Sequence, residues 1–264
     1  MVYFIICLTA LGTSFMTIFS GFGLGTLLMP AFALFFPIEL AVAMTAIVHF
    51  LNNIFKFVLF GKYTDRNVLL KFAIPGIIAA LIGAFILTQV SGFEPIAGYA
   101  IGSKNFEITI VKLVVGLIMI GFAFFELLPK FSKIQFDKKW LPFGGMISGF
   151  FGGLSGNQGA MRSAFLSKAG LSKEAFVGTG VAIAMLIDIA RLTIYTEDIF
   201  RRDIVGNWLL ILVATLCAFL GAFIGKKIFK KVTIRTIQVF VGILLILVGV
   251  CLAIGITSTS LNGF

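Results

Sequence analysis

Residues Gly152–Arg162, which read GGLSGNQGAMR, are the stretch around which we expect this chain to be organised. The stretch lies in apolar sequence, yet its glycines interrupt a helix and its side chains include two amides and a guanidinium. A backbone break at membrane depth leaves N–H and C=O groups that hydrocarbon cannot satisfy, so it must be packed in protein or line a polar cavity. We expect a helix to restart near Gly159 with its electropositive end facing the break, which favours an anion.

A similar break, SGFGLG at Ser20–Gly25, occurs in the first half of the chain. Two interrupted apolar segments at corresponding positions of two halves indicate the substrate site of a secondary transporter.

The composition indicates a polytopic membrane protein. Hydrophobic residues make up 59% of the 264 residues and charged residues only 12%, with a mean hydropathy of +1.11; a soluble domain carries about 25% charged residues. The net charge of +10 comes from short loops between apolar runs, so it reflects topology rather than nucleic-acid binding. Cys7, Cys217 and Cys251 are isolated in apolar runs, so we expect packing roles and neither a metal nor a cofactor.

Apolar runs divide the chain into two similar series. They are 2–20, 24–36, 38–60, 68–90 and 110–128, then 141–155, 159–169, 172–196, 208–229 and 236–256. Crossing a bilayer takes about 20 residues, so 24–36 and 159–169 are too short to cross alone. We therefore predict an all-α integral membrane protein with about 8–10 helical segments. Each half has a re-entrant or broken helix pair followed by three transmembrane helices, and 91–109 is expected to be a loop.

The two halves also match residue by residue, which predicts an N-terminal repeat 1–129, a cytoplasmic linker 130–140 and a C-terminal repeat 141–264. The matched pairs, at offsets of 134 or 135, include Gly25 with Gly159, Thr45 with Thr179, Asn53 with Asp188, and Lys56 with Arg191.

The distribution of charge predicts the orientation. About 13 Lys and Arg fall in loops 62–67, 130–139, 168–173 and 226–235, against about three (Lys104, Arg201 and Arg202) in the opposite loops and tails. Placing the basic loops in the cytoplasm puts both termini outside. Corresponding helices then run in opposite directions, so the repeat is inverted, which is the arrangement that supports alternating access.

Arg162 is the leading candidate for substrate binding, because it lies one turn after the second break and its guanidinium can grip an oxyanion bidentately. The structural alternatives are a backbone carbonyl partner or a position near lipid headgroups. The complete set that we expect around the substrate is Arg162, Asn157, Gln158, Gly159, Gly23, Gly25, Asn52, Asn53, Lys56 and Arg191.

Asp188 and His49 are candidates for coupling or gating. A charged side chain inside the bilayer is costly and is a functional hypothesis by default. Asp188 can also pair structurally with Arg191, three residues later on the same helix face. His49, the only histidine, can change charge near neutral pH, although a lone histidine can equally be a hydrogen-bonded packing group.

At the two breaks the sequence resembles the sulfite exporter TauE/SafE family, also called the toluene sulfonate uptake permease family. The resemblance rests on residues 21–25 (GFGLG) with Pro30, on residues 152–156 (GGLSG) with Gly159, and on an Ala-xxx-Thr pattern at 41–45 and 175–179. It implies transport of small sulfur-containing anions, such as sulfite, sulfoacetate or other organosulfonates, across a bacterial inner membrane. Asn157, Gln158 and Arg162 depart from the glycine-rich form of the family.

The favoured hypothesis is a secondary transporter, not an enzyme, that moves a small organosulfonate or sulfur oxyanion by alternating access, with export as the expected direction. The coupling ion, H⁺ or Na⁺, and the assembly, including a homodimer in membrane lipid, stay open. One alternative is an anion channel on the same fold. Another is an intramembrane serine protease, since residues 153–156 fit a GxSG pattern and His49 could act as its base.

Overall fold

The computed structural model describes residues 1–17, 23–102, 104–128, 136–195, 204–228 and 234–256. Its first half contains α1 (Val2–Thr17), α2 (Gly25–Ala33), α3 (Ile38–Phe60), α4 (Arg66–Ser91) and α5 (Ile110–Leu127). The second half contains α7 (Leu141–Ser155), α8 (Gly159–Leu166), α9 (Lys173–Ile194), α10 (Trp208–Ile228) and α11 (Ile234–Ala253). The short turns η1 (Gly61–Tyr63) and η2 (Lys138–Trp140) precede α4 and α7. The helices follow the predicted apolar runs, and α8 begins at Gly159 as predicted.

Polar side chains fix where several of the long helices begin. Asp65, Thr109 and Ser172 precede α4, α5 and α9, and each accepts a hydrogen bond from a backbone N–H in the first turn, at 2.9, 3.2 and 3.1 Å. Such caps satisfy donors that a helix end would otherwise leave unpaired.

Four helical segments of the described chain are long and apolar enough to cross a membrane: Ile38–Tyr63, Arg66–Ser91, Lys173–Ile194 and Trp208–Lys227. Val2–Thr17, Ile110–Phe125 and Val241–Ala253 are shorter apolar helices. Large apolar side chains such as Ile74, Ile78 and Ile82 lie exposed along the outer face of α4. An extended apolar surface of this kind is covered by lipid. The chain is therefore a multi-pass membrane protein.

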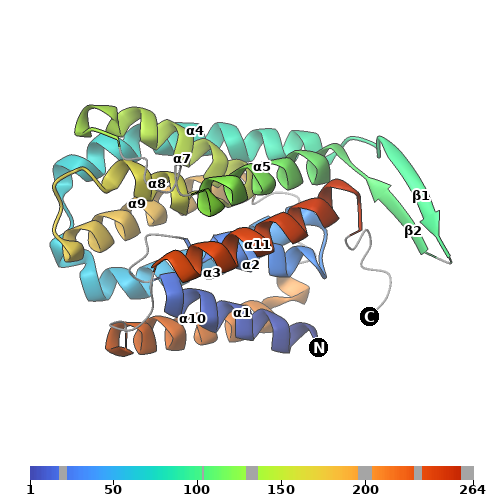
Figure 1. Cartoon of the computed structure of the whole chain (residues 1–264), viewed down its shortest axis with the longest axis horizontal. Coiled ribbons are helices and arrows are strands. Elements are labelled where there is room, and N and C mark those ends of the chain that lie inside the picture. The colour runs from blue at the N-terminus through green and yellow to red at the C-terminus, as the bar shows by residue number, and fades with distance from the viewer. Residues whose placement is uncertain (18–22, 103, 129–135, 196–203, 229–233, 257–264) are drawn as a thin grey trace.

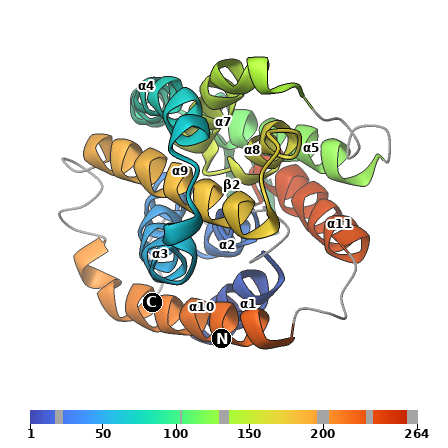
Figure 2. The ribbon, with the colours of Figure 1, turned by 90° about the vertical axis from the view of Figure 1, so that its left-hand side faces the viewer.

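Several helix contacts recur when the two halves are exchanged. If α1–α5 are matched in order with α7–α11, the contact of α4 with α7 corresponds to that of α10 with α1, and α4 with α9 corresponds to α10 with α3. In Figures 1 and 2, α4 and α7 form one face of the molecule, α1 and α10 form the opposite face, and α3 and α9 lie between them. The helix α2 is buried along its whole length at the centre.

The helices α3 and α9, which occupy matching places in the two halves, run antiparallel to each other. The carbonyl of Phe60, at the end of α3, lies against Gly178 near the start of α9. Farther along, His49 of α3 contacts Asp188 of α9. This antiparallel pairing supports the predicted inverted repeat.

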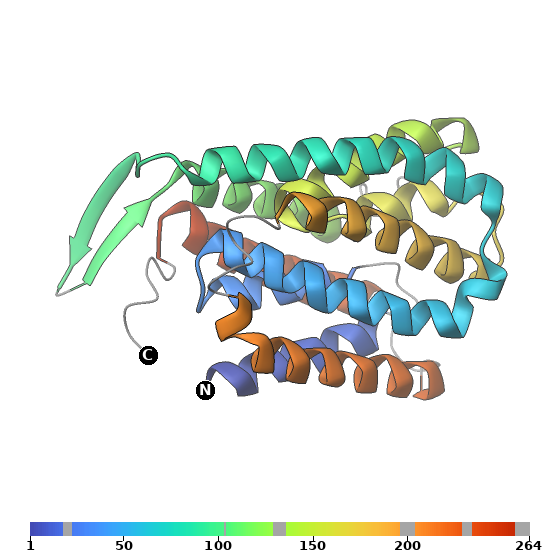
Figure 3. The ribbon, with the colours of Figure 1, turned by 180° about the vertical axis from the view of Figure 1, so that it is seen from behind.

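A second helix pair shows the same relation. Gly116 in α5 packs against Gly249 near the end of α11, whereas Leu127 at the end of α5 packs against Gly242. The start of α1 and the end of α11 lie at the same end of the molecule (Figure 3).

The helices α7 and α8 fold back on each other as a hairpin. The Ser148 hydroxyl donates to the carbonyl of Gln158 at 3.0 Å. One helix turn earlier, Gly144 faces the ring of Phe165. Gly156 closes α7 in the left-handed conformation with φ 77°, where its N–H bonds the carbonyl of Gly152. The second pair is therefore re-entrant in shape.

Glycines allow α7 to lie unusually close to α4. Gly145, Gly149 and Gly153 face the backbone of α4, and a Cβ at any of them would collide with a carbonyl oxygen of that helix. Small residues spaced by four bring two helix backbones together in membrane proteins. This packing fixes the direction of α7 and therefore the position of the break at its end.

The expectation of a loop at 91–109 was wrong. The strands β1 (Ala97–Ile101) and β2 (Lys104–Ile108) pair antiparallel and project beyond the helices (Figure 1). Gly102 supplies the turn with φ 62°, and the rings of Tyr99 and Phe106 stack across the strands at 5.4 Å. The Tyr99 hydroxyl donates to the carbonyl of Ile254 and ties the hairpin to the end of α11.

Parts of three predictions lie outside the described residues. These are Ser20 and Gly21 of the first break, much of the basic loops 130–139 and 226–235, and Arg201 and Arg202.

Candidate functional site

The two breaks meet inside the molecule, with the starts of α2 and α8 beside each other. A Cβ at Gly25 would lie 3.0 Å from the carbonyl oxygen of Gly156, and a Cβ at Gly23 would lie 3.9 Å from the Cα and N of Gly159. Both helices therefore present their N-terminal, electropositive ends to the same interior region.

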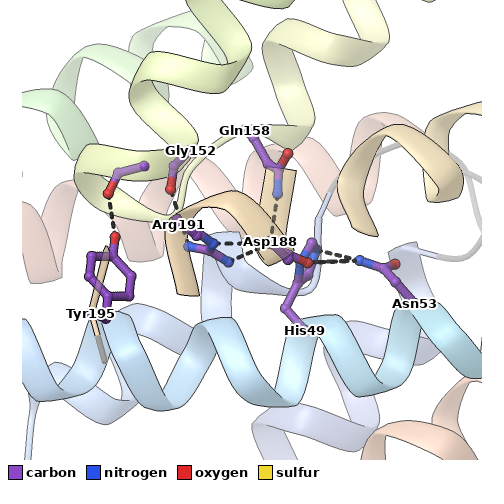
Figure 4. Close-up of polar contacts among 8 residues, drawn as sticks. His49, Asn53, Gly152, Gln158, Asp188, Arg191 and Tyr195 are labelled. Atoms are coloured by element: carbon purple, nitrogen blue, oxygen red, sulfur yellow. Dashed lines mark hydrogen bonds and ion pairs between the residues drawn. The ribbon is translucent and has the colours of Figure 1, made fainter. Parts of the chain in front are cut away.

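A buried carboxylate, Asp188, organises the polar residues next to the breaks (Figure 4). Its Oδ2 lies 2.6 Å from His49 Nδ1, and the Asn53 amide donates to the same oxygen at 3.4 Å. Its Oδ1 accepts from Gln158 Nε2 at 3.1 Å and from Arg191 Nε at 3.0 Å. The partners come from α3, the second break and α9, so this one side chain joins the two halves of the chain.

The C-terminal carbonyls of α7 are satisfied by side chains of the α9 region. Arg191 Nη1 donates to the carbonyl of Gly152 at 3.1 Å, and the Tyr195 hydroxyl donates to the carbonyl of Gly153 (Figure 4). Both side chains are buried, with 0% and 1% of their surface exposed. A helix can end at this depth because its free carbonyls have these donors.

A partly enclosed cavity lies beside this network, between α3, α8 and α9. Its enclosed space is small: the centre of a water molecule can occupy about 30 Å³ of it, and the free space is about 410 Å³ when the open mouth is included. Its polar lining consists of Thr17, His49, Asn53, Lys56, Arg162 and Ser163. Leu166, Phe176, Val177 and Val181 supply an apolar wall on one side.

The charges around the cavity and the network are unbalanced. Lys56, Arg162 and Arg191 are 4%, 6% and 0% exposed. Among the buried side chains of the described residues, Asp188 is the one carboxylate. It forms an ion pair with Arg191 Nη2 at 2.8 Å. The three cations outnumber the one anion by two positive charges, before any charge on His49 is added. Isolated buried charge is costly, so this region favours an anionic ligand.

The structure brings five of the predicted residues to the cavity, namely Gly23, His49, Asn53, Lys56 and Arg162. Gln158, Arg191 and Asp188 lie one layer behind, engaged with one another. Asn52 accepts a hydrogen bond from Ser14 at 3.2 Å, and Asn157 donates to Ser155 at 3.4 Å. Gly25 and Gly159 support the contact of the two helix starts.

Sequence reasoning missed Thr17 at the cavity, Tyr195 at the helix end and the apolar wall. Thr17 and Tyr195 come at the ends of apolar runs, and no motif or helical spacing in the sequence distinguishes them from their neighbours. The wall residues differ from ordinary packing residues only in their position in three dimensions.

The serine of the GxSG pattern is not placed for catalysis by His49. The Ser155 hydroxyl donates to the carbonyl of Phe151 in its own helix at 3.0 Å. His49 directs its Nδ1 to Asp188 instead. Ser155 is therefore held by its own helix, and His49 pairs with Asp188 rather than with a serine.

Comparison with known proteins gives one match. The model of the family described as "Sulfite exporter TauE/SafE" matches residues 6–252, which is nearly the whole chain. No curated protein and no solved structure matches it.

Proposed function

Because the chain belongs to the sulfite exporter TauE/SafE family, a family of membrane transporters for sulfite-like anions, we propose that it carries a small organosulfonate or sulfur oxyanion by alternating access. The substrate occupies the cavity between α3, α8 and α9, where Arg162 and Lys56 are its main ligands.

The excess of buried positive charge carries this proposal. Arg162 comes from α8 and Lys56 from α3, so the two cations reach the cavity from different halves. The guanidinium offers paired donors to two oxygens of a sulfonate, and the ammonium adds a point charge. Asn53 and Ser163 complete the polar lining, where the Asn53 amide donates to Asp188 and the Ser163 hydroxyl donates to the carbonyl of Gly159.

The arrangement of the two halves supports alternating access. The cavity lies toward the end of the molecule where α3 ends and α9 begins, since Lys56 and Val177 line it. On the other side, the Asp188 network and Tyr195 close the path. A second, inverted half can open that side when the first closes.

We place the mouth of the cavity in the cytoplasm of a bacterial cell, with both termini outside the inner membrane. The basic residues Lys62, Arg66 and Lys168 flank this end. Substrate that enters from the cytoplasm leaves on the opposite side, so the transport is export. A homodimer is compatible with this arrangement, since each chain holds its own cavity.

His49 and Asp188 form the coupling element of the proposal. The ring of His49 lines the cavity and its Nδ1 contacts Asp188. A proton on this pair changes the charge beside the substrate and the strength of the contact between α3 and α9. Proton binding and substrate binding are thereby linked.

Transport by purified protein in liposomes tests the proposal, with sulfoacetate, sulfite and taurine as substrates. We expect saturable uptake of at least one anion, and a loss of about 30-fold or more for Arg162→Ala, since removal of one buried charged partner costs about 2 kcal/mol or more. Lys168→Ala removes an exposed cation just after α8 and serves as the matched control. Wild-type activity of Arg162→Ala rejects the site, and flux that does not saturate indicates a channel.

A further inference from the structure

We propose that a groove on the outer face of α9 binds an anionic phospholipid, whose headgroup meets Lys62 and Arg66 and whose acyl chain lies along the helix. The site is separate from the substrate cavity, and only its assignment to the cytoplasmic leaflet rests on the orientation proposed above. The inference is carried by the shape of the groove and by the cations at one end of it.

The floor of the groove is one face of α9, and its sides are the two neighbouring helices. Figures 2 and 3 show α9 between α3 and α4, and in Figure 3 the turn that joins α3 to α4 crosses one end. Phe57 of α3 and Leu69 of α4 flank the groove, in which the centre of a water molecule can occupy about 430 Å³. The floor residues recur every three or four positions and are Ala182, Met185, Leu186 and Ile189. They lie on a different face of α9 from Val177, Gly180 and Val181, which line the substrate cavity.

Two cations lie at the end of the groove that this turn closes. Lys62 and Arg66 line the groove and are exposed, and within the described part of the chain neither forms an ion pair with a carboxylate. The neighbouring Asp65 caps α4 and does not line the groove. The Thr64 hydroxyl is buried at the same end and has no hydrogen-bond partner among the described residues, so a phosphate oxygen would satisfy it.

The groove is about as long as one leaflet of a bilayer is thick. The turn lies level with Gly178, because a Cβ at that glycine would meet the carbonyl of Phe60 and would lie 3.4 Å from the backbone N of Thr64. Ile189 lies about 16 Å farther along α9 at 1.5 Å per residue, and half of a hydrocarbon core of about 30 Å is about 15 Å. The cations therefore lie at the depth of the headgroups and the apolar floor at the depth of the acyl chains.

These features favour an anionic phospholipid over a soluble anion. The groove opens on the outer surface of the helices, where Phe57 and Ile189 are 39% and 45% exposed and lipid covers apolar side chains. Basic residues at headgroup depth attract anionic headgroups in preference to neutral ones. The apolar floor contributes to the binding of a lipid, because it contacts an acyl chain that a free phosphate ion lacks.

Lipid binding to the purified protein, measured by native mass spectrometry, tests the inference. The probes are phosphatidylglycerol and phosphatidylcholine with identical acyl chains, which differ in net charge. Each basic residue near a membrane surface favours an anionic lipid by about fivefold, so we expect the wild-type protein to prefer phosphatidylglycerol by about tenfold or more. Lys62→Gln combined with Arg66→Gln should reduce this preference to about twofold or less, mainly by weakening the binding of phosphatidylglycerol.

Two controls separate this groove from other sources of affinity. Lys71→Gln removes an exposed cation of α4 that does not line the groove, and it should keep the wild-type preference. Glycerol phosphate carries a phosphate without acyl chains and should not displace bound phosphatidylglycerol. Thermal unfolding reports whether each variant folds, and either single variant should lower the preference by about twofold or more if the double variant does not fold.

Several results would overturn the inference. Equal binding of the two lipids by the wild-type protein would do so, and so would the wild-type preference in the folded double variant. An equal loss in Lys71→Gln would assign the preference to the general surface charge, and displacement by glycerol phosphate would make the groove a site for soluble anions. None of these measurements involves substrate transport, so this inference and the proposed function can each fail without the other.

Discussion

At the scale of single residues, the Asp188 carboxylate determines how the polar centre is held. It accepts from Gln158 and Arg191 through one oxygen and contacts His49 and Asn53 through the other. Removal of this carboxylate leaves the buried Arg191 guanidinium without its counter-charge. This destabilises the protein by far more than the intact ion pair stabilises it.

Asp188→Asn should therefore destabilise the protein strongly. A loss of about 3 kcal/mol corresponds to a fall of about 10 °C in Tm. Thermal unfolding in detergent measures it. Glu174→Gln, at an exposed position in the first turn of the same helix, should leave Tm unchanged. An unchanged Tm for Asp188→Asn would show that the network does not hold the halves together.

His49 tests the coupling role. His49→Gln keeps a polar side chain of similar size but removes the titratable ring. In liposomes with an imposed pH gradient, we expect the variant still to exchange substrate across the membrane. Its accumulation of substrate against a substrate gradient should fall by about tenfold or more, which corresponds to the loss of about 1.4 kcal/mol of coupling between proton and substrate binding. Accumulation by the wild-type protein that follows a sodium gradient instead would contradict proton coupling.

At the scale of secondary-structure elements, the packing of α7 on α4 sets the depth of the second break. The glycines of α7 allow backbone-to-backbone contact, so the end of α7 is positioned by α4 and held by Arg191 and Tyr195 from the other side. A shift of α7 would move Asn157, Gln158 and α8 together.

Gly149→Ala should destabilise this contact, because the added methyl group meets the carbonyl of Gly76. The expected cost is about 1–3 kcal/mol, as for overpacking elsewhere, visible as a lower Tm in detergent. Gly121→Ala, in α5, has no neighbour within 4 Å of its new Cβ and should be neutral or slightly stabilising. Equal stability of the two variants would be inconsistent with the close packing described.

The helices were predictable because long apolar runs and glycine breaks reflect the length and the chemistry of a bilayer. The hairpin at 97–108 was not, because its pairing depends on a turn at Gly102 and on contacts with the end of α11. Within the candidate site, the charged residues were predictable, because a charge inside the membrane is energetically costly and therefore indicates a structural or functional role. The pairing of Asp188 with Arg191 was also expected from their spacing, but the position of Arg191 behind the cavity was not, because it depends on how α9 packs against the end of α7.

At the scale of the whole molecule, the distribution of basic residues predicts which ends of the helices face the cytoplasm. The loop before the hairpin and the turn before α4 lie at opposite ends of α4. With Cys7, Cys217 and Cys251 replaced by alanine, Glu94→Cys should react with an impermeant maleimide on intact cells, whereas Lys62→Cys should react only after permeabilisation. The reverse pattern would invert the proposed orientation.

The contact of His49 with Asp188 has a consequence for how such a chain can change over generations. His49 and Asp188 belong to different copies of what resembles one duplicated segment, so the sequence of one copy cannot change at this contact independently of the other. A substitution in one segment is therefore tolerated only if it preserves the contact with the other segment, so the two segments change together. Separately expressed fragments, each with an incomplete polar centre, would have to find each other before either could settle in the bilayer.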